Sequence, residues 1–255
     1  MRRIVQFSDP HLVGVGKTLK DVDTFARFQR CVETALSMPQ TSDASTYIIS
    51  GDIAHDESRE TYERLDVYLN KVGGEWFCIP GNHDDPSLLY EVMPKRCIEP
   101  AVGWRSAQLN ASLNVHLLSS HVPGEVGGAL NEPSLVSLAK ASSQAQLVVL
   151  HHPPLSLNDP LFDAMALSNQ AGFWAQIEKN DSIVGVLFGH AHRAYEEIRE
   201  TGGQRVSVLG CPSTAFQYGM DNDHPFGFDP SRFGFRALNY DDTRGLETEV
   251  VWLDA

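Results

Sequence analysis

Long apolar runs, basic residues and paired cysteines are all scarce in this sequence. No stretch approaches the ~20 consecutive apolar residues of a membrane-spanning helix. The N-terminal segment MRRIVQFSD carries two arginines, but its apolar run is far too short for the core of a signal peptide. These absences predict a cytoplasmic protein that does not insert into a membrane.

Positive charge is in deficit. The chain has 20 Lys and Arg against 33 Asp and Glu, which gives a formal net charge of −13. This balance argues against a protein that binds nucleic acid or an anionic membrane through a general positive field. An anionic substrate would need a local positive charge to overcome such a background.

The four cysteines are scattered and form neither a CxxC pair nor a short-spaced framework. In a chain this long we expect them to be reduced and mostly structural. What is present is ordinary for a globular protein, since 42% of the 255 residues are hydrophobic and can bury a substantial core. No internal repeat, low-complexity segment or linker is visible, so we predict one domain over residues 1–255.

Short β-rich runs alternate with helical patterns in the first part of the chain, and hairpins dominate the last seventy residues. The predicted strands are 3–8, 46–50, 75–80, 145–150 and 182–188, with hairpins at 104–120, 193–210 and 232–254. The predicted helices are 24–38, 58–72 after the N-cap Ser58, and one around 132–141. Early βαβ units followed by antiparallel hairpins indicate two packed sheets flanked by helices.

Two segments resist such assignment. Residues 153–170 lie between two predicted core strands and lack a clean period, and long irregular loops in compact domains are usually functional. Residues 213–228 combine aromatic and polar groups, which suits either a substrate pocket or a packing or dimer contact. We place both segments on the substrate side of the domain.

Polar residues able to bind a metal follow five of the predicted strands, and ligand sites of open α/β sheets lie outside the carboxyl ends of strands. The five groups are Asp9-Pro10-His11, Gly51-Asp52, Gly81-Asn82-His83-Asp84, His151-His152-Pro153 and Gly189-His190-Ala191-His192. Burying several charges and imidazoles together without compensation is costly. Their convergence therefore predicts a metal site.

In this order the patterns DxH, GD, GNH(D), HxP and GHxH resemble the calcineurin-like metallophosphoesterase superfamily, over residues 4–192. The tail LGCPSTAFQYG and the variants GNHDD and LHHPPL are similar to the bacterial class III cyclic-nucleotide phosphodiesterases, and the glycerophosphodiester phosphodiesterases are about as close. The resemblance implies a four-layer α/β/β/α sandwich of two mixed β-sheets flanked by helices.

The resemblance also implies a centre of two divalent or mixed-valence metal ions. Its ligands would be Asp9, His11 and His192 for one ion, Asn82, His151 and His190 for the other, and a bridging Asp52. Carboxylate, amide and imidazole ligands without thiolate suit Mn²⁺, Fe²⁺/Fe³⁺ or Zn²⁺. Two such ions would outweigh the carboxylates and create a local positive charge that attracts a phosphodiester monoanion.

A metal-bridging hydroxide would then attack phosphorus directly, without a phospho-enzyme. By resemblance His83 would hydrogen-bond the phosphoryl oxygen or protonate the leaving alkoxide, and we also expect substrate contacts from Asn82, His55 and His192. Asp84 either orients His83 or is a solvated turn residue or helix cap before Pro86. His152 and Arg193 flank ligands, whereas His116, His121 and His224 have no motif support and are expected at the surface or in packing.

The favoured activity is hydrolysis of 3′,5′-cyclic nucleotides such as cAMP or cGMP to 5′-monophosphates. A glycerophosphodiesterase or broad phosphodiester hydrolase is the main alternative, and the charge disfavours a nuclease. A non-catalytic scaffold would show a broken ligand position, but all seven are present.

The sequence departs from its relatives at two places. It has LLSS at 117–120, where they carry LLDS, and PSLVSLAKA at 133–141 in place of their Gln-Leu-x-Trp-Leu helix. The expected partner is a small phosphodiester, and homo-oligomerisation stays open.

Overall fold

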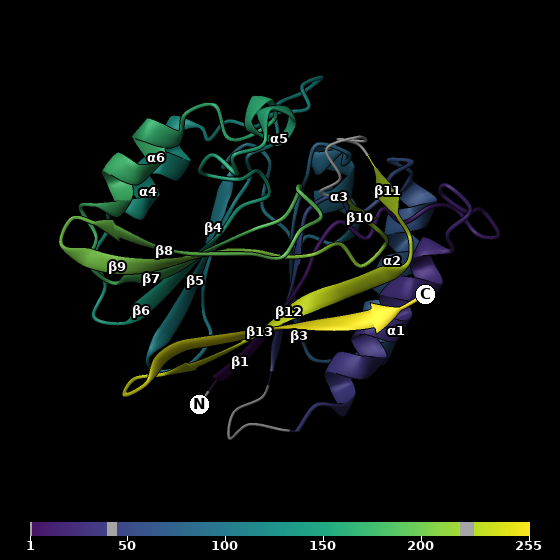
Figure 1. The fold of residues 1–255 in the computed structure, drawn as a ribbon, viewed down its shortest axis with the longest axis horizontal. Helices are drawn as coiled ribbons and strands as arrows, with labels where there is room; N and C mark the ends of the chain where they lie inside the picture. The colour runs from purple at the N-terminus through teal and green to yellow at the C-terminus, as the bar shows by residue number, and fades with distance from the viewer. Residues whose placement is uncertain (1, 40–44, 220–226) are drawn as a thin grey trace.

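The computed structural model describes residues 2–39, 45–219 and 227–255 and contains two large mixed sheets (Figure 1). The first sheet has the order β13-β12-β1-β2-β3. Its strands are β1 (Arg2–Phe7), β2 (Thr46–Ser50), β3 (Glu75–Ile79), β12 (Arg232–Asp241) and β13 (Gly245–Asp254). β1, β2 and β3 are parallel, and β12 pairs antiparallel with both β1 and β13.

The second sheet has the order β4-β5-β6-β7-β9-β8. Its strands are β4 (Trp104–Gln108), β5 (Leu113–Leu118), β6 (Ala145–Val149), β7 (Ile183–Phe188), β8 (Tyr195–Thr201) and β9 (Gln204–Gly210). The four central strands are parallel, and β4 and β8 pair antiparallel at the two edges. A small ribbon of β10 (Gln217–Tyr218) and β11 (Phe228–Asp229) lies apart.

Alternation along the strands builds the layers, because successive side chains point to opposite faces of a sheet. Ile4 and Ile48 of the first sheet join Val149 of the second in a core between the sheets. The opposite faces carry Val5 and Phe7, which pack with α1 (Thr24–Ser37) and α2 (Arg59–Val72), and Val186 and Phe188, which pack with α6 (Gln170–Ile177) near α4 (Glu132–Leu138). The predicted four-layer α/β/β/α sandwich is confirmed, with the helices on its two outer sides (Figure 1).

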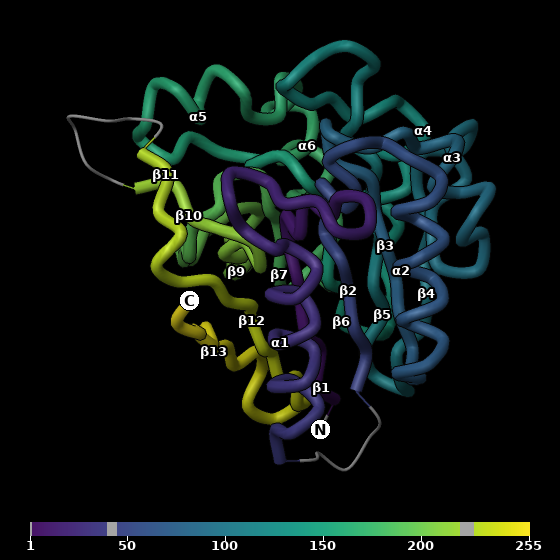
Figure 2. The backbone as a smooth tube through the Cα atoms, turned by 90° about the vertical axis from the view of Figure 1, so that its right-hand side faces the viewer, coloured from purple at the N-terminus to yellow at the C-terminus, as the bar shows by residue number. Residues whose placement is uncertain are grey.

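The predicted helix start at Ser58 is also confirmed. The Ser58 hydroxyl accepts a hydrogen bond from the Thr61 amide, and Gly73 ends α2 with a φ of +74°. Figure 2 shows α1 and α2 together over one outer face of the molecule. Among the described residues no helix has the length and apolar character needed to cross a membrane.

Three short helices were not predicted: α3 (Pro86–Val92), α5 (Pro160–Ala164) and α6. α3 and α5 both begin at an Asp-Pro pair whose Asp side chain caps the helix, so a local signal was available. α5 lies inside the segment 153–170, for which the sequence predicts an irregular loop. Residues 220–226 of the other segment, with His224, lie outside the described residues.

Candidate metal centre

The backbone turns sharply after the strands that carry the predicted ligands. Among the described residues, nine that are not glycine have a positive φ, and five of these nine are predicted ligands. The five are Asp9 (+49°), His11 (+43°), Asp52 (+51°), His190 (+67°) and His192 (+49°). Non-glycine residues rarely adopt this left-handed region, and such strained positions concentrate at functional sites.

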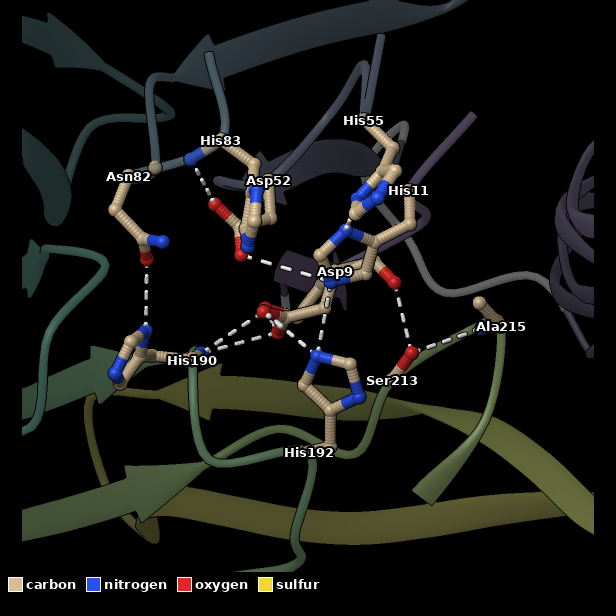
Figure 3. Close-up of polar contacts among 12 residues, drawn as sticks. Asp9, His11, Asp52, His55, Asn82, His83, His190, His192, Ser213 and Ala215 are labelled. Atoms are coloured by element: carbon tan, nitrogen blue, oxygen red, sulfur yellow. Dashed lines mark hydrogen bonds and ion pairs between the residues drawn. The ribbon is translucent and has the colours of Figure 1, made fainter. Parts of the chain in front are cut away.

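The loop after β7 explains how His190 and His192 serve one centre. Residues two apart share a face only in a regular strand. His190 and His192 instead have left-handed backbones, so the chain turns at both residues. Both rings nevertheless face inward (Figure 3). The His190 amide donates to both carboxylate oxygens of Asp9 at 3.1 Å. A Cβ at Gly189 would overlap the Ser8 hydroxyl, so this close approach requires glycine.

The first cluster contains Asp9, His11 and His192, all buried. The His11 and His192 Nε2 atoms are 3.0 Å apart, and His192 Nε2 lies 3.3 Å from Asp9 Oδ1. His192 Nδ1 is 2.8 Å from the Phe216 carbonyl oxygen, which can only accept, so Nδ1 carries the proton. Nε2 therefore presents its lone pair to the centre, as metal-binding imidazoles do.

The second cluster joins Asn82, His151 and His190. Asn82 Oδ1 lies 3.3 Å from His151 Nε2 and 3.0 Å from His190 Nδ1. His151 Nδ1 donates to the Ser50 carbonyl oxygen at 2.8 Å, which leaves Nε2 free to act as a ligand. The amide oxygen of Asn82 thus lies within 3.3 Å of one ring nitrogen of each histidine.

Asp52 lies between the two clusters. Its Oδ2 is 3.5 Å from His11 Nε2, and its Oδ1 is 3.3 Å from His151 Nε2. The His83 amide donates to Oδ1 at 2.9 Å and holds the carboxylate in place. A Cβ at the neighbouring Gly81 would overlap Oδ1, so only glycine leaves room for this bridging position.

The electrostatics show that the residues fit bound cations. Burial lowers the pKa values of His11 and His190 well below the usual range, so both rings are neutral and available as ligands. Burial also lowers the pKa of His151, but the charge and hydrogen bond of Asp52 outweigh it and raise that pKa to about 9. A proton on His151 meets the demand for positive charge that two metal ions would meet more fully.

His83 and His55 stand beside the first cluster. The ring centroid of His83 is 5.2 Å from that of His11 and 4.8 Å from that of His55. His55 Nδ1 lies 3.2 Å from His11 Nδ1, so His55 contacts a predicted ligand directly. Burial, helped by the neighbouring His83, lowers the pKa of His55.

The roles predicted for Asp84 are wrong, and it is Asp85 that caps α3. Its carboxylate is buried and accepts hydrogen bonds from the backbone amides of Ile53, Ala54 and Gly81 and from the Tyr62 hydroxyl. It therefore ties the loop after β2 to the loop after β3 instead of facing solvent or orienting the His83 ring. Burial and the charge of Asp52 raise the pKa of Asp84 to about 6.

His152 follows a predicted ligand, and one of its ring nitrogens lies within 4.8 Å of a ring nitrogen of His151 and of His190. Both ring nitrogens of His152 are already engaged, however, because Nδ1 is 2.8 Å from the Ser120 hydroxyl and Nε2 is 3.0 Å from the Val126 carbonyl oxygen. Arg193 turns away toward α5, where it pairs with Asp159 at 2.8 Å and lies 4.5 Å from the Phe162 ring centre. The geometry thus places both residues outside the clusters.

A cavity of about 180 Å³ lies over the clusters. One side is an apolar wall of Phe162, Met165 and Tyr218, which come from the two segments placed on the substrate side. His83 and Asn82 line the cavity as well, and they also line a neighbouring groove of about 560 Å³. The groove is lined by Glu57, 82–87, His121 and 123–126.

Sequence reasoning missed several of these neighbours. His121 was expected in packing or at the surface, but it lies in the groove beside His83. Val126 lines both cavities without any local signal. The Phe216 ring stacks on His11 with centroids 5.7 Å apart, and the Ser213 hydroxyl donates to the Asp9 carbonyl oxygen at 2.7 Å. His116, by contrast, is buried in β5 away from the site.

Comparison with known proteins gives independent evidence about the family of this chain. A relative from Vibrio vulnificus named 3′,5′-cyclic adenosine monophosphate phosphodiesterase CpdA is 28% identical, with 97% of this chain and 89% of that protein covered. A 3′,5′-cyclic-nucleotide phosphodiesterase of Nostoc is 28% identical over 92% of this chain and 86% of its own length.

In fold, the chain is similar to a dimetal phosphatase from Danio rerio. The TM-score is 0.64 at 11% identity, and 99% of this chain and 98% of that one are covered. The family model for calcineurin-like phosphoesterases matches residues 2–194, which include every predicted ligand. This chain belongs to the calcineurin-like phosphoesterase family.

Proposed function

We propose that the protein is a phosphodiesterase that hydrolyses 3′,5′-cyclic nucleotides to 5′-monophosphates at a binuclear metal centre. The observation that carries the proposal is the position of Asp52 between two buried ligand clusters, with His83 at the cavity above them. The names of the Vibrio and Nostoc relatives support the choice of cyclic nucleotides.

The ligands would be Asp9, His11 and His192 on one side, Asn82, His151 and His190 on the other, and Asp52 between. Two ions held there would supply a hydroxide nucleophile near neutral pH and stabilise negative charge on the phosphoryl oxygens. We expect Mn²⁺, Fe²⁺/Fe³⁺ or Zn²⁺, because the donors are carboxylate, amide and imidazole. The carbonyl groups of Ser50 and Phe216 hold two of the imidazoles in the tautomer that can bind.

The remaining residues act on the substrate. Hydrolysis forms one bond from a hydroxide oxygen to phosphorus and breaks the bond from phosphorus to the ribose 3′ oxygen, which leaves as an alkoxide. His83 gives this alkoxide its proton, a role that suits imidazole. We expect Asn82 and His192, which line the cavity, and His55, which contacts His11, to bind the phosphoryl group, while the apolar wall contacts the rest of the substrate in the cavity.

A broad phosphodiester or glycerophosphodiester hydrolase is a second candidate. The observation in its favour is the groove, which continues from the cavity at Asn82 and His83 and gives space for a separate alcohol. A scaffold without catalysis is disfavoured because all seven ligand positions and His83 are present. Cytoplasmic location stays a prediction of the sequence, and homo-oligomerisation stays open.

A substrate panel tests the proposal. The protein loaded with Mn²⁺ is assayed with cAMP, cGMP, 2′,3′-cyclic nucleotides, glycerophosphoethanolamine and a phosphomonoester. We expect the highest kcat/KM for a 3′,5′-cyclic nucleotide, with the 5′-monophosphate as product. A clear preference for the glycerophosphodiester would favour the second candidate, and hydrolysis of the monoester alone would contradict both.

A further inference from the structure

The groove beside the metal cavity has a defined relation to the proposed proton donor. The two spaces share Asn82, His83 and Val126, so the groove opens from the cavity at His83. Its volume of about 560 Å³ lies in the range of small-molecule sites, ~300–1,000 Å³, whereas the cavity of about 180 Å³ is too small for a whole nucleotide. Part of the substrate must therefore extend beyond the cavity.

The position of His83 indicates which part that is. A general acid must come within hydrogen-bond reach of the oxygen that it protonates, so the leaving oxygen lies next to His83. The alcohol attached to this oxygen then continues past His83 into the groove. Phe162, Met165 and Tyr218 line the cavity but not the groove, so the part of the substrate that stays in the cavity meets this apolar wall.

The groove is acidic. Glu57 and Glu125 are exposed on its lining and Asp85 is half-buried there, and none of the described lining residues is a lysine or an arginine. Asp85 also caps α3 by accepting hydrogen bonds from two backbone amides, which keeps its carboxylate at the groove. Glu57 and Asp85 act electrostatically on His121, whose pKa burial nevertheless lowers, so this ring adds no positive charge near pH 7.

We propose that this groove receives the leaving alcohol and that its carboxylates select against alcohols that carry a further negative charge. The inference rests on the proposed function and deepens it. The substrate class is then phosphodiesters with a neutral or cationic leaving alcohol. In a 3′,5′-cyclic nucleotide this alcohol is the nucleoside itself, which carries no further charge and stays joined to phosphorus through its 5′ oxygen. Diesters whose leaving arm bears another phosphate or a carboxylate are disfavoured, because like charges repel across the groove.

Two synthetic diesters test the proposal. Both are methyl aryl phosphates, one with 4-hydroxybenzoate as the leaving phenol and the other with its neutral methyl ester. The readout is the ratio of kcat/KM for the neutral over the charged substrate, measured with the Mn²⁺-loaded protein. The variant Glu57→Gln/Glu125→Gln removes two groove charges, and Glu33→Gln/Glu200→Gln, with both residues exposed outside the groove, makes the same change in net charge elsewhere.

We expect the ratio to fall about five- to tenfold in the groove variant and to stay unchanged in the control variant, as expected for two nearby like charges in a high dielectric. Comparing ratios cancels the different intrinsic reactivity of the two phenols. Because salt screens exposed charges, 0.5 M NaCl should also narrow the ratio of the unmodified protein. If the ratio of kcat/KM for the neutral over the charged substrate were the same in the unmodified protein, the groove variant and the control variant, the inference would be overturned and the proposed function would stay intact. If none of them cleaved any phosphodiester, the proposed function itself would fail.

Discussion

At the scale of single residues, backbone conformation and imidazole tautomer define the site. The chain holds Asp9, Asp52 and His190 in left-handed conformations, and Gly51 and Gly189, which precede the last two, allow the loops to approach. The histidines of the site could be identified from the sequence because each belongs to a short, local pattern. The carbonyl groups that orient them could not, because Phe216 O reaches His192 from a loop 24 residues away and backbone atoms leave no mark in a sequence.

His83→Ala should separate proton donation from metal binding. We expect bound metal to be retained, because the ring of His83 belongs to neither ligand cluster, and kcat for cAMP to fall by about 10²–10⁴. The loss should be smaller for bis(p-nitrophenyl) phosphate, because nitrophenolate leaves without help from an acid. Metal content and both kcat values decide the matter, and loss of the metal in this variant would show that His83 is misassigned.

Asn82→Ala and His190→Ala should remove ligands of the second ion. The chain should stay folded by circular dichroism, bind less metal and lose hydrolysis of bis(p-nitrophenyl) phosphate. His116→Asn, at a buried histidine in β5 outside the clusters, serves as the matched control and should keep its metal. Retained activity in both ligand variants would contradict a centre with two ions.

At the scale of elements, one histidine connects the loops around the cavity. His152 follows a ligand of β6, bonds to Ser120 after β5, and reaches the Val126 carbonyl oxygen in the loop that lines both cavities. Gly128 of that loop pairs in turn with Leu167, close to Met165 of the apolar wall. The site therefore depends on contacts between loops that are far apart in the sequence.

Ser120→Ala should loosen this connection. Removing the partner of a buried polar group costs about 1–3 kcal/mol, so the free energy of unfolding in urea should fall by that amount. We also expect KM to rise more than kcat falls, because Val126 lines the cavity without belonging to either ligand cluster. Ser119→Ala, one residue earlier and half-buried, is the control. A drop in stability with no change in KM would mean that Ser120 has only a structural role.

Elements with strong periodicity were predictable, whereas short ones were not. The strands of both sheets and the helices α1 and α2 match their predicted positions to within one or two residues. α5 has five residues and too little length for a hydrophobic period, although its Asp159-Pro160 start is typical of a helix. The predicted helix around 132–141 ends at Leu138, because Ala139 serves as its C-cap.

At the scale of the whole molecule, the centre lies where the two sheets meet. Asp9 and His11 follow β1 of the first sheet, and His192 follows β7 of the second. Asn82 follows β3 of the first sheet, whereas His151 follows β6 of the second. Each proposed ion would therefore link the sheets, and a local positive charge would be placed inside a chain whose formal net charge is −13.

Metal binding should consequently stabilise the fold. A ligand that binds only the folded state at 100 times its Kd contributes about 2.7 kcal/mol, which raises Tm by roughly 5–10 °C per site for a chain of this size. Scanning calorimetry of chelator-treated protein, with and without Mn²⁺, measures the shift. Ca²⁺ prefers a shell of oxygen ligands and should give a much smaller one. An identical Tm in all three samples would argue against ions that link the sheets.

The affinity for metal should also depend on pH, and the sign follows from His151. In the metal-free protein Asp52 raises the pKa of His151 to about 9, so the ring is protonated at pH 7 and must lose its proton to bind an ion. Binding should therefore release about one proton from this residue at pH 7. Affinity should rise by about tenfold per pH unit up to pH 9 and then level off.

Calorimetric titration of Mn²⁺ in buffers of different ionisation enthalpy counts the protons released. His151→Gln cannot be protonated in this range and should lose the pH dependence along with most of the affinity. A metal affinity of the unmodified protein that did not change with pH would show that His151 is not protonated in the metal-free protein, and that Asp52 does not raise its pKa as proposed.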